Sequence, residues 1–360
     1  MAHPSPIFDG HNDMLLRIGD NPERFLKGDG EGHLDLPRAR QGGLGGGFCA
    51  VFVRSPDEED RMAPLEPDYA LRQAARTAGR LFSLERASEG QVKVVRDADQ
   101  LETALENGTF AAIFHMEGAE AIGPELGELE LFYQAGLRSL GPVWSRPNIF
   151  AQGVPFGSGS PDTGPGLTAA GERLVTACNQ LGIMIDLSHL NERGFWDVAR
   201  NSDAPLVATH SNAHAISPQT RNLTDKQLDA IAQSDGMVGL NFAVYFLRPD
   251  SDMQDREADA SLELMVRHID HLIERLGIDR VGFGSDFDGA HVPAAIGDVA
   301  GLPALIQALR NAGYDEDAIA KLTHQNWLRV LRKTWKCDGQ CETRNKPRKT
   351  QNSRLPDRRG

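Results

Sequence analysis

The amino-acid sequence predicts a (β/α)8 barrel of the TIM type, an α/β fold, with extra helices at the C-terminal end. Three observations support this fold. The chain contains eight short apolar runs, and most of them lack alternation with polar residues, which is typical of parallel strands covered on both faces. Helical patterns separate most of these runs. The chain has 360 residues, and such a barrel needs roughly 250 or more.

The predicted strands and helices alternate along the chain. The strand candidates are residues 7–8, 47–53, 111–114, 137–143, 183–187, 205–209, 237–242 and 280–284. The longest helical patterns cover residues 65–88, 168–181 and 259–276, and shorter ones cover 97–106, 125–135, 191–201 and 224–234. Thr168 opens a segment rich in Ala, Leu and Val, and Thr224 stands where an N-cap is expected. Residues 300–335 are expected to form closing helices.

An open, doubly wound sheet is the alternative arrangement. No G-x-G-x-x-G motif follows an early strand, which weakens a dinucleotide-binding interpretation. Residues 144–167 are rich in Gly, Pro and Ser and are expected to form a long loop, either a lid or a flexible insertion. We expect one domain over residues 1–335. Residues 336–360 are a basic tail without apolar periodicity, which we expect to be disordered.

Composition excludes several classes of protein. The net charge of −13 argues against a nucleic-acid-binding surface, and a role with nucleic acid would rest only on the basic tail. Four cysteines are too few for a disulfide framework; Cys49 and Cys178 are expected to be buried thiols, whereas Cys337 and Cys341 lie in the tail. No secretory signal and no apolar run of about 20 residues is found, so a cytoplasmic protein without a membrane span is expected.

Potential metal ligands follow five of the predicted strands. In a (β/α)8 barrel the active site lies at the C-terminal ends of the strands. His11 and Asp13 are two residues apart, so an extended chain would point both side chains the same way. Each of these polar residues has an ordinary structural explanation when taken alone, but together they predict a metal site on one rim. The residues at these strand ends are His11, Asp13, Glu117, His189, His210 and Asp286.

The types of side chain indicate the metal. No thiolate is present, and three imidazoles with two of the three carboxylates suit zinc best, with manganese or cobalt as alternatives. Five ligands are too many for one tetrahedral zinc ion with an open position. They fit two metal ions that share one carboxylate, a centre that can hold a hydroxide and polarise a carbonyl group.

The motifs FDGHND, HMEGAEAI, IDLSHL, ATHSNAHAI followed by TRN, and GSDFDG resemble those of the renal (membrane) dipeptidase family. This family comprises binuclear-zinc peptidases of the amidohydrolase superfamily. The resemblance covers about residues 7–333 and includes the closing sequence NWLRV. It implies a zinc-dependent dipeptidase that cleaves dipeptides, L-Xaa-D-Xaa among them, with a metal-bridging hydroxide. It also implies a homodimer.

The resemblance assigns a metal-binding role to five residues of this chain. His11 and Asp13 would bind one Zn²⁺. The second Zn²⁺ would be bound by His189 and His210, and Glu117 would bridge both ions.

Three further residues receive roles from the resemblance. Asp286 would take a proton from the hydroxide and pass it to the leaving amine. Arg221 would pair with the terminal carboxylate of the substrate, a contact that suits a guanidinium fork. Many family members carry a histidine after the fourth strand, where this chain has Trp144. An indole N–H can donate a hydrogen bond but carries no charge, so stabilisation of the oxyanion would depend more on the metal ions.

Two other functions remain open. Another amidohydrolase reaction on the same centre, such as hydrolysis of an N-acyl amino acid, an amide or a lactone, is the nearest alternative. A substrate without a carboxylate would leave Arg221 without a partner. A binding protein that has lost catalysis is the second, and the intact Asp286 beside all five ligands argues against it.

Other polar residues near the motifs have more ordinary expectations. His115 is expected to face away from Glu117. Asp186 and Asp288 are expected to orient neighbouring ligands. We expect the side chains of His268 and His271 to be solvated on a charged helix, and Arg146 to lie in the long loop with a role in substrate contact at most.

Overall fold

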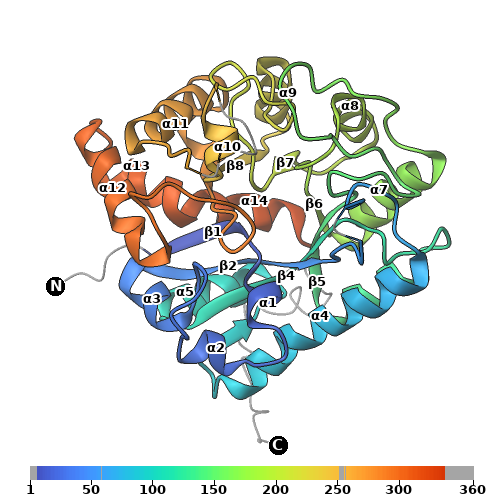
Figure 1. Ribbon diagram of the computed structural model, residues 1–360, viewed down its shortest axis with the longest axis horizontal. Coiled ribbons are helices and arrows are strands. Elements are labelled where there is room, and N and C mark those ends of the chain that lie inside the picture. The colour runs from blue at the N-terminus through green and yellow to red at the C-terminus, as the bar shows by residue number, and fades with distance from the viewer. Residues whose placement is uncertain (1–5, 58, 251–254, 256, 337–360) are drawn as a thin grey trace, which may run out of the picture.

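The strands of this protein close into a nearly complete parallel barrel. The computed structural model describes residues 6–57, 59–250, 255 and 257–336. Within these residues the strand order is β6-β5-β4-β2-β1-β9-β8-β7, and the helices surround the sheet (Figure 1). The two end strands meet at a parallel bridge between Asp186 and Val207, where the N–H of Leu187 donates to the carbonyl of Val207 at 2.8 Å. The predicted fold class is confirmed.

The bounds of the elements are as follows. The strands are β1 (Ile7–Asn12), β2 (Leu44–Phe52), β3 (Val92–Val94), β4 (Phe110–Glu117), β5 (Leu137–Gly141), β6 (Met184–Ile185), β7 (Val207–Ala208), β8 (Met237–Asn241) and β9 (Val281–Gly284). The helices are α1 (Met14–Ile18), α2 (Glu23–Leu26), α3 (Leu36–Gly42), α4 (Pro67–Ala87), α5 (Ala98–Glu106), α6 (Gly127–Ala135), α7 (Ala169–Leu181), α8 (Glu192–Asn201), α9 (Asp225–Gln233), α10 (Val244–Leu247), α11 (Leu262–Leu276), α12 (Leu302–Asn311), α13 (Glu316–Ala320) and α14 (Asn326–Thr334). Short helical turns are η1 (Ile278–Arg280), η2 (Val299–Gly301) and η3 (Lys321–Gln325).

The structure differs from the prediction mainly in short elements. β1 continues to Asn12 instead of ending at Phe8, so His11 lies within the strand. β3 was not predicted, because three residues are too few to show a periodic pattern; it pairs only with β4, outside the ring. The longer helical patterns are all confirmed, and residues 300–335 do form helices.

Polar residues begin several helices where the sequence indicated. The side chain of Thr168 accepts a hydrogen bond from the N–H of Gly171 at the start of α7. Thr224 is the N-cap of α9, and its own N–H donates to Gln227 Oε1 at 2.8 Å. These contacts satisfy backbone groups that have no partner inside the helix.

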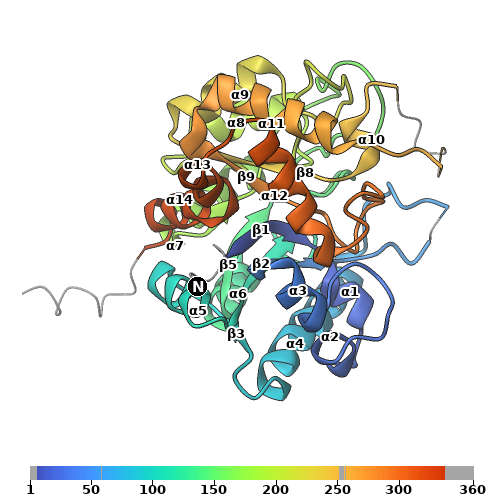
Figure 2. The same ribbon diagram turned by 90° about the vertical axis from the view of Figure 1, so that its left-hand side faces the viewer.

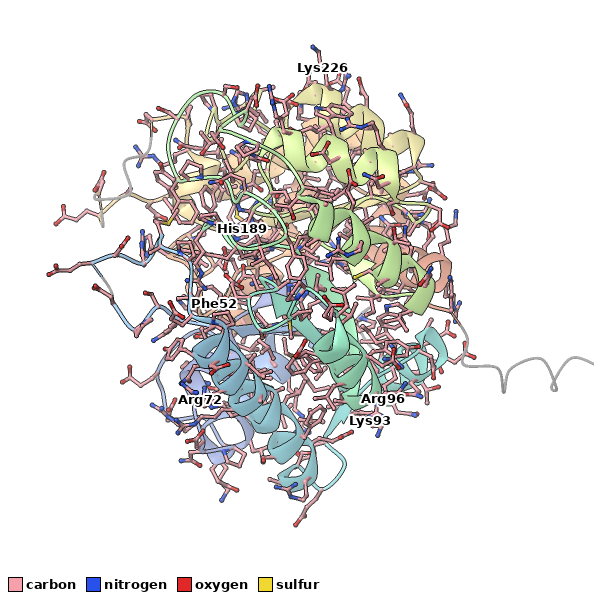
Figure 3. All side chains as sticks on the ribbon, turned by 90° about the vertical axis from the view of Figure 1, so that its right-hand side faces the viewer. Phe52, Arg72, Lys93, Arg96, His189 and Lys226 are labelled. Carbon is pink, nitrogen blue, oxygen red and sulfur yellow. The ribbon has the colours of Figure 1, made fainter. Side chains whose placement is uncertain are left out.

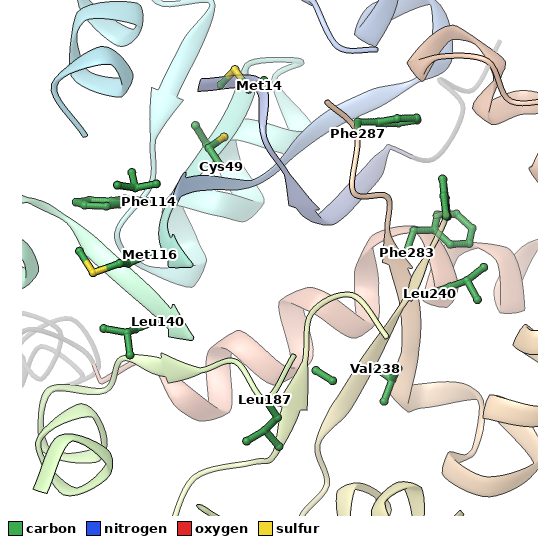
Figure 4. Close-up of a cluster of buried hydrophobic side chains, with 14 of the residues drawn as sticks. Met14, Cys49, Phe114, Met116, Leu140, Leu187, Val238, Leu240, Phe283 and Phe287 are labelled. Carbon is green, nitrogen blue, oxygen red and sulfur yellow. The ribbon is translucent and has the colours of Figure 1, made fainter. Parts of the chain in front are cut away.

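The side chains of β4 point alternately outward and inward and so belong to two different apolar clusters. Phe114 and Met116 point outward into the layer between strands and helices, which also contains Phe283 (Figure 4). Ile113 belongs to a second cluster, which also contains Phe48 and Trp327. Because side chains two apart share a face of a strand, Glu117 follows Ile113 along the inner face and stands at its C-terminal end.

Helix α14 closes the barrel at the N-terminal ends of the strands. The ring of Trp327 lies 5.2 Å from that of Phe48 and is fully buried. Its Nε1–H donates to the carbonyl of Phe283 at 3.2 Å. A side chain at Gly10 would place its Cβ 2.5 Å from Trp327, so glycine is required there. Figure 2 shows α14 on one side of β1, and α1 and α10 on the other. The predicted metal ligands lie at the opposite end, where the strands end.

The loop of residues 144–167 lies against the loops that follow β6 and β7. Gly153 forms an isolated bridge with Leu190, and Ser158 forms one with Gln219. The expected long loop is therefore present, and it is paired with its neighbours at two points.

The structure can be compared with the predictions for two of the four cysteines and for only one residue of the basic tail. Cys49 and Cys178 are buried free thiols, as predicted. Cys337, Cys341 and almost all of the predicted basic tail lie outside the described residues. In the part of the chain that the structure describes, no helix combines the length and the apolar character needed to cross a bilayer.

Candidate metal centre

The five predicted metal ligands lie together at the C-terminal end of the barrel. His11 comes from β1, Glu117 ends β4, and Asp13 precedes α1; His189 and His210 follow β6 and β7. All five side chains are buried. Their common neighbour is Glu117 Oε1, which lies 3.7 Å from His11 Nε2, 3.1 Å from His189 Nε2 and 3.6 Å from His210 Nε2. His11 Nε2 is also 3.5 Å from Asp13 Oδ2.

These separations fit a metal centre. Ligand atoms bound tetrahedrally to one zinc ion are about 3.4 Å apart, since each lies about 2.0–2.1 Å from the metal. The donor atoms form one group of His11, Asp13 and Glu117 and another of Glu117, His189 and His210, each within 4.8 Å. Both ring nitrogens of His11 are buried without a hydrogen-bond partner among the described residues. Burial of unpaired nitrogens is costly, and a cation bound at Nε2, the nitrogen that faces Asp13 and Glu117, would satisfy one of them. The residues thus fit two cations that share Glu117.

The charges in this cluster favour a cation. Burial raises the pKa of Glu117 to about 8. Burial acts against a charge on His11, but Glu117 and Asp13 outweigh it and raise the pKa of His11 to about 10. Metal and protons compete for such ligands. These pKa shifts indicate that the carboxylates of the site attract positive charge.

Hydroxyl groups orient two of the imidazoles. His189 Nδ1 is hydrogen-bonded to Ser145 Oγ at 2.8 Å, and His210 Nδ1 to Thr209 Oγ1 at 2.8 Å. Asp186 in turn accepts from Thr209 Oγ1 at 2.5 Å. Each ring is thereby held with Nε2 toward Glu117. Asp186 lies behind His210, where it can have the orienting role expected of it.

Replacing Ser145 with alanine should weaken metal binding by roughly 10–100-fold, the scale for partners of metal ligands. The substitution leaves Nδ1 of His189 without its partner, so the ring is no longer fixed. The affinity is measured by competition with a chromogenic chelator. Ser160→Ala, in an exposed part of the same loop, is the control and should bind metal normally. Equal affinities of the two variants would refute the role of Ser145.

Backbone strain accompanies these residues. His189, Asp286 and Asp288 have φ angles of 68°, 61° and 66°, which non-glycine residues seldom adopt. Such conformations persist only where surrounding contacts hold them, and they concentrate at functional sites.

Asp286 lies beside Asp13 at the edge of the metal centre. A Cβ atom at Gly289 would lie 2.2 Å from Asp13 Oδ2 and 2.5 Å from Asp286 Oδ1, so only glycine leaves room for both carboxylates. Asp286 Oδ2 accepts from Asn241 Nδ2 at 3.0 Å. Burial, reinforced by the charge of Asp13, raises the pKa of Asp286. A carboxyl group that holds a proton more readily than usual is suited to proton transfer.

A cavity of about 550 Å³ opens onto the metal centre. Asp13, Glu117, His189 and Asp286 contribute to its lining, together with several aromatic rings. Trp144 is one of these, and its ring lies 5.9 Å from that of His189. In Figure 3, His189 and Phe52 lie between α4 and the pair of helices α8 and α9. Lys226 lies at the outer surface of the molecule in the same view. A volume of this size suits a small ligand.

Arg221 lies behind the wall of this cavity and does not line it. Its two terminal nitrogens donate to Ser211 Oγ at 2.6 Å and to the carbonyl of His210 at 3.0 Å. Its Nε is buried without a partner among the residues described. The guanidinium is 5.7 Å from the ring of Phe246, which does line the cavity. Burial lowers its pKa to about 10, so it stays cationic at neutral pH.

The expectation that His115 faces away from Glu117 is wrong. Its ring lies 5.3 Å from that of His11, and its Nε2 is 3.7 Å from Asp186 Oδ2. His115 and Glu117 are two apart in a strand, and that spacing would have predicted a shared face. Burial lowers the pKa of His115 to about 3, so the ring is neutral.

The expectation that both histidines of α11 are solvated is also wrong. His268 is fully buried and its Nε2 is hydrogen-bonded to the carbonyl of Leu247 at 2.9 Å. Helical spacing places it on the same face as the buried Met265, Ile269 and Leu272. His271 is only partly exposed and pairs with Asp225 Oδ1 at 2.8 Å.

Arg146 is a buried structural contact of the cavity wall. Its Nε donates to Glu120 Oε1 at 2.7 Å, and a terminal nitrogen donates to the carbonyl of Val53 at 2.5 Å. It thus joins the loops that follow β2, β4 and β5. The sequence suggested only a loop residue, because the partners are far apart along the chain.

Asp9 is a buried carboxylate that sequence reasoning missed. It accepts from the N–H of Ser285 at 2.6 Å, from Ser285 Oγ at 2.8 Å and from Asn12 Nδ2 at 3.2 Å. These contacts tie β1 to the start of the loop that carries Asp286. An acidic residue within an apolar strand was the available signal, since buried charges are rare without partners.

Comparisons with known proteins identify the relatives of this chain. The sequence model of the membrane dipeptidase family, peptidase family M19, matches residues 1–344. A metallopeptidase from Rhodobacter sphaeroides, solved with a phosphinate mimic of the dipeptide L-Ala-D-Ala, is 55% identical over 92% of this chain and all of that chain, with a TM-score of 0.88. The solved dipeptidase AC, a metallopeptidase of family M19, is 56% identical over 92% of this chain and 99% of its own, with a TM-score of 0.89. A Klebsiella pneumoniae protein encoded in the pqqA 5′ region is 51% identical over 250 residues, which are 69% of this chain and 91% of that protein.

Proposed function

This chain belongs to the membrane dipeptidase family (peptidase family M19) and is a hydrolase that acts on dipeptides, and we propose that it does so with two zinc ions held by His11, Asp13, Glu117, His189 and His210. The observation that carries the proposal is the placement of three imidazole nitrogens within 3.1–3.7 Å of Glu117 Oε1. The absence of thiolates from this set favours zinc, manganese or cobalt over copper(I) or an iron–sulfur cluster.

The chain's own residues would divide the remaining work. Metal ions bound here would lower the pKa of a water molecule and polarise the scissile carbonyl. Asp286 would accept the proton of the attacking water and deliver it to the amine nitrogen that leaves. Asn241 holds Asp286 Oδ2, so Oδ1, next to Gly289 and Asp13, is the oxygen available for this transfer. Trp144 would form the wall beside His189 and donate a hydrogen bond to the substrate.

We further propose that L-Xaa-D-Xaa dipeptides are among the substrates. The phosphinate mimic bound by the Rhodobacter sphaeroides metallopeptidase represents L-Ala-D-Ala, and that protein shares more than half of its residues with this chain. Arg221 would place positive charge behind Phe246 and so attract the terminal carboxylate of a short peptide.

Replacing Arg221 with methionine should raise KM and lower kcat/KM roughly 10–100-fold, because it removes the positive charge behind Phe246 that would attract the carboxylate of the substrate, and a charge pair about 8 Å apart near a protein surface contributes on the order of 2 kcal/mol. With dipeptide amides, which lack the carboxylate, the KM and kcat/KM of the same variant should differ much less from those of the wild type. Steady-state kinetics on matched acids and amides measure this. An unchanged KM for the free dipeptide would count against the carboxylate contact.

The proposal as a whole is tested by metal analysis followed by a substrate panel. We expect two equivalents of zinc per chain and turnover of L,L- or L,D-dipeptides. N-acyl amino acids and lactones belong in the same panel, because they represent the alternative reaction on this centre. Turnover of these compounds without cleavage of any dipeptide would replace the proposed function with the alternative one.

The homodimer implied by the family resemblance and the single hydrolase domain over residues 1–335 also remain proposals. Light scattering after size-exclusion chromatography tests the first, and limited proteolysis tests the second.

A further inference from the structure

The segment between α2 and α3 contacts the loop that carries Asp286, although the two are far apart in the sequence. His33 and Asp288, which are 255 positions apart, form two reciprocal hydrogen bonds. The N–H of His33 donates to Asp288 Oδ1 at 2.6 Å, and the N–H of Asp288 donates to His33 Nδ1 at 2.9 Å. The imidazole thus satisfies a backbone group of the loop.

Other contacts bring the same segment against Asp288. Arg17 Nε donates to Asp288 Oδ2 at 3.3 Å, and another Arg17 nitrogen donates to the carbonyl of Leu34 at 2.7 Å. A Cβ atom at Gly32 would lie 2.4 Å from Asp288 Oδ1, and the φ of Gly32 is +61°. Glycine at this position therefore allows the close approach.

The contacted loop is strained and needs such support. Asp286 and Asp288 both have positive φ angles, at a cost of roughly 1–3 kcal/mol each. Strand β1 holds the first of these residues, since the N–H of Asp286 donates to the carbonyl of His11 at 3.0 Å. Within the loop, the N–H of Gly289 donates to the carbonyl of Asp286 at 3.0 Å. His33 holds the second of the two strained residues from outside the loop.

We propose that His33 is a positioning residue for Asp286: it holds the turn of residues 286–289 in its strained conformation by accepting the N–H of Asp288. His33 does not line the cavity, so it acts through the loop and has no contact with substrate. The inference rests on the role proposed above for Asp286. Burial lowers the pKa of His33, which keeps the ring neutral and its Nδ1 able to accept.

The test compares three variants of the metal-loaded enzyme. His33→Ala should lower kcat by about 10–100-fold, the scale of a misplacement of about 1 Å, while KM and bound metal stay within about twofold. His33→Asn should recover most of the lost kcat, because its amide oxygen can accept in place of Nδ1. His271→Ala is the matched control: His271 is a partly buried histidine with a hydrogen bond of 2.8 Å to Asp225, and its variant should have normal kcat.

Hydrogen exchange supplies a readout that does not depend on turnover. The amides of residues 286–290 should exchange faster in His33→Ala than in the wild type, and at the wild-type rate in His271→Ala. A normal kcat in His33→Ala, or a loss of kcat that His33→Asn does not recover, would overturn the inference. If the wild type cleaved no dipeptide, the proposed function would fail, whereas the exchange rates would still show whether His33 holds the loop.

Discussion

Replacing Glu117 with glutamine will remove metal from the centre and lower dipeptide turnover by about 10³-fold or more, because metal ions contribute several kcal/mol to such reactions. Glu117 Oε1 is the shared neighbour of the imidazoles of His11, His189 and His210. Glutamine keeps the volume of the side chain but removes its charge. We expect at least one equivalent of metal per chain to be lost, as measured by elemental analysis of the purified variant.

Chelation provides the companion experiment. Removal of metal from the wild type should abolish turnover, and added zinc should restore it, whereas the same concentration should not restore Glu117→Gln. Glu130→Gln, on the exposed surface of α6, serves as the control and should behave as the wild type. A Glu117→Gln variant with full metal content and normal turnover would contradict the shared-carboxylate arrangement.

Replacing Asp286 with asparagine should lower kcat by about 100-fold or more while metal content and KM stay nearly normal. The expected size is that of a group that transfers a proton in the transition state. Asparagine tolerates the positive φ of 61° at this position, and its amide oxygen can still accept from Asn241. The substitution therefore removes the titratable group and leaves the backbone in place. Steady-state kinetics and metal analysis of the same preparation measure both quantities.

Asp235→Asn is a matched control for this variant. Asp235 also has a positive φ, of 56°, but it forms ion pairs with Arg280 and Arg329 and does not line the cavity. Its replacement should leave turnover unchanged. If Asp286→Asn retained turnover near that of the wild type, its proposed role would be rejected; if it lost metal, the effect would belong to the metal centre instead.

The barrel could be predicted because its signals are local. Continuous apolar runs such as residues 237–242 report burial on both faces, and helical spacing between them reports a crossover. The candidate site could be predicted from barrel topology, since the C-terminal ends of barrel strands share one rim. His11, Glu117 and His210 lie together there, and their binding of metal stays a prediction.

Elements and contacts without a periodic signal could not be predicted in this way. β3 spans only Val92–Val94, and such a short run gives no pattern. His268 is buried because α11 packs with that face inward, although its neighbours in sequence are charged. His115 is the exception among the errors, because its spacing of two residues from Glu117 already contained the answer.

The sequence by itself determined the strand–helix alternation, the cysteine burial and the list of candidate ligands, because each depends on residues that are neighbours along the chain or on a rule of barrel topology. The tertiary structure alone decided which side chains support those ligands. Asp9 with Ser285, Arg146 with Glu120 and His33 with Asp288 are pairs that only the folded chain brings within hydrogen-bonding distance. Hydrogen bonds act over about 3 Å, whereas a sequence pattern carries no information on that distance between residues that are far apart along the chain.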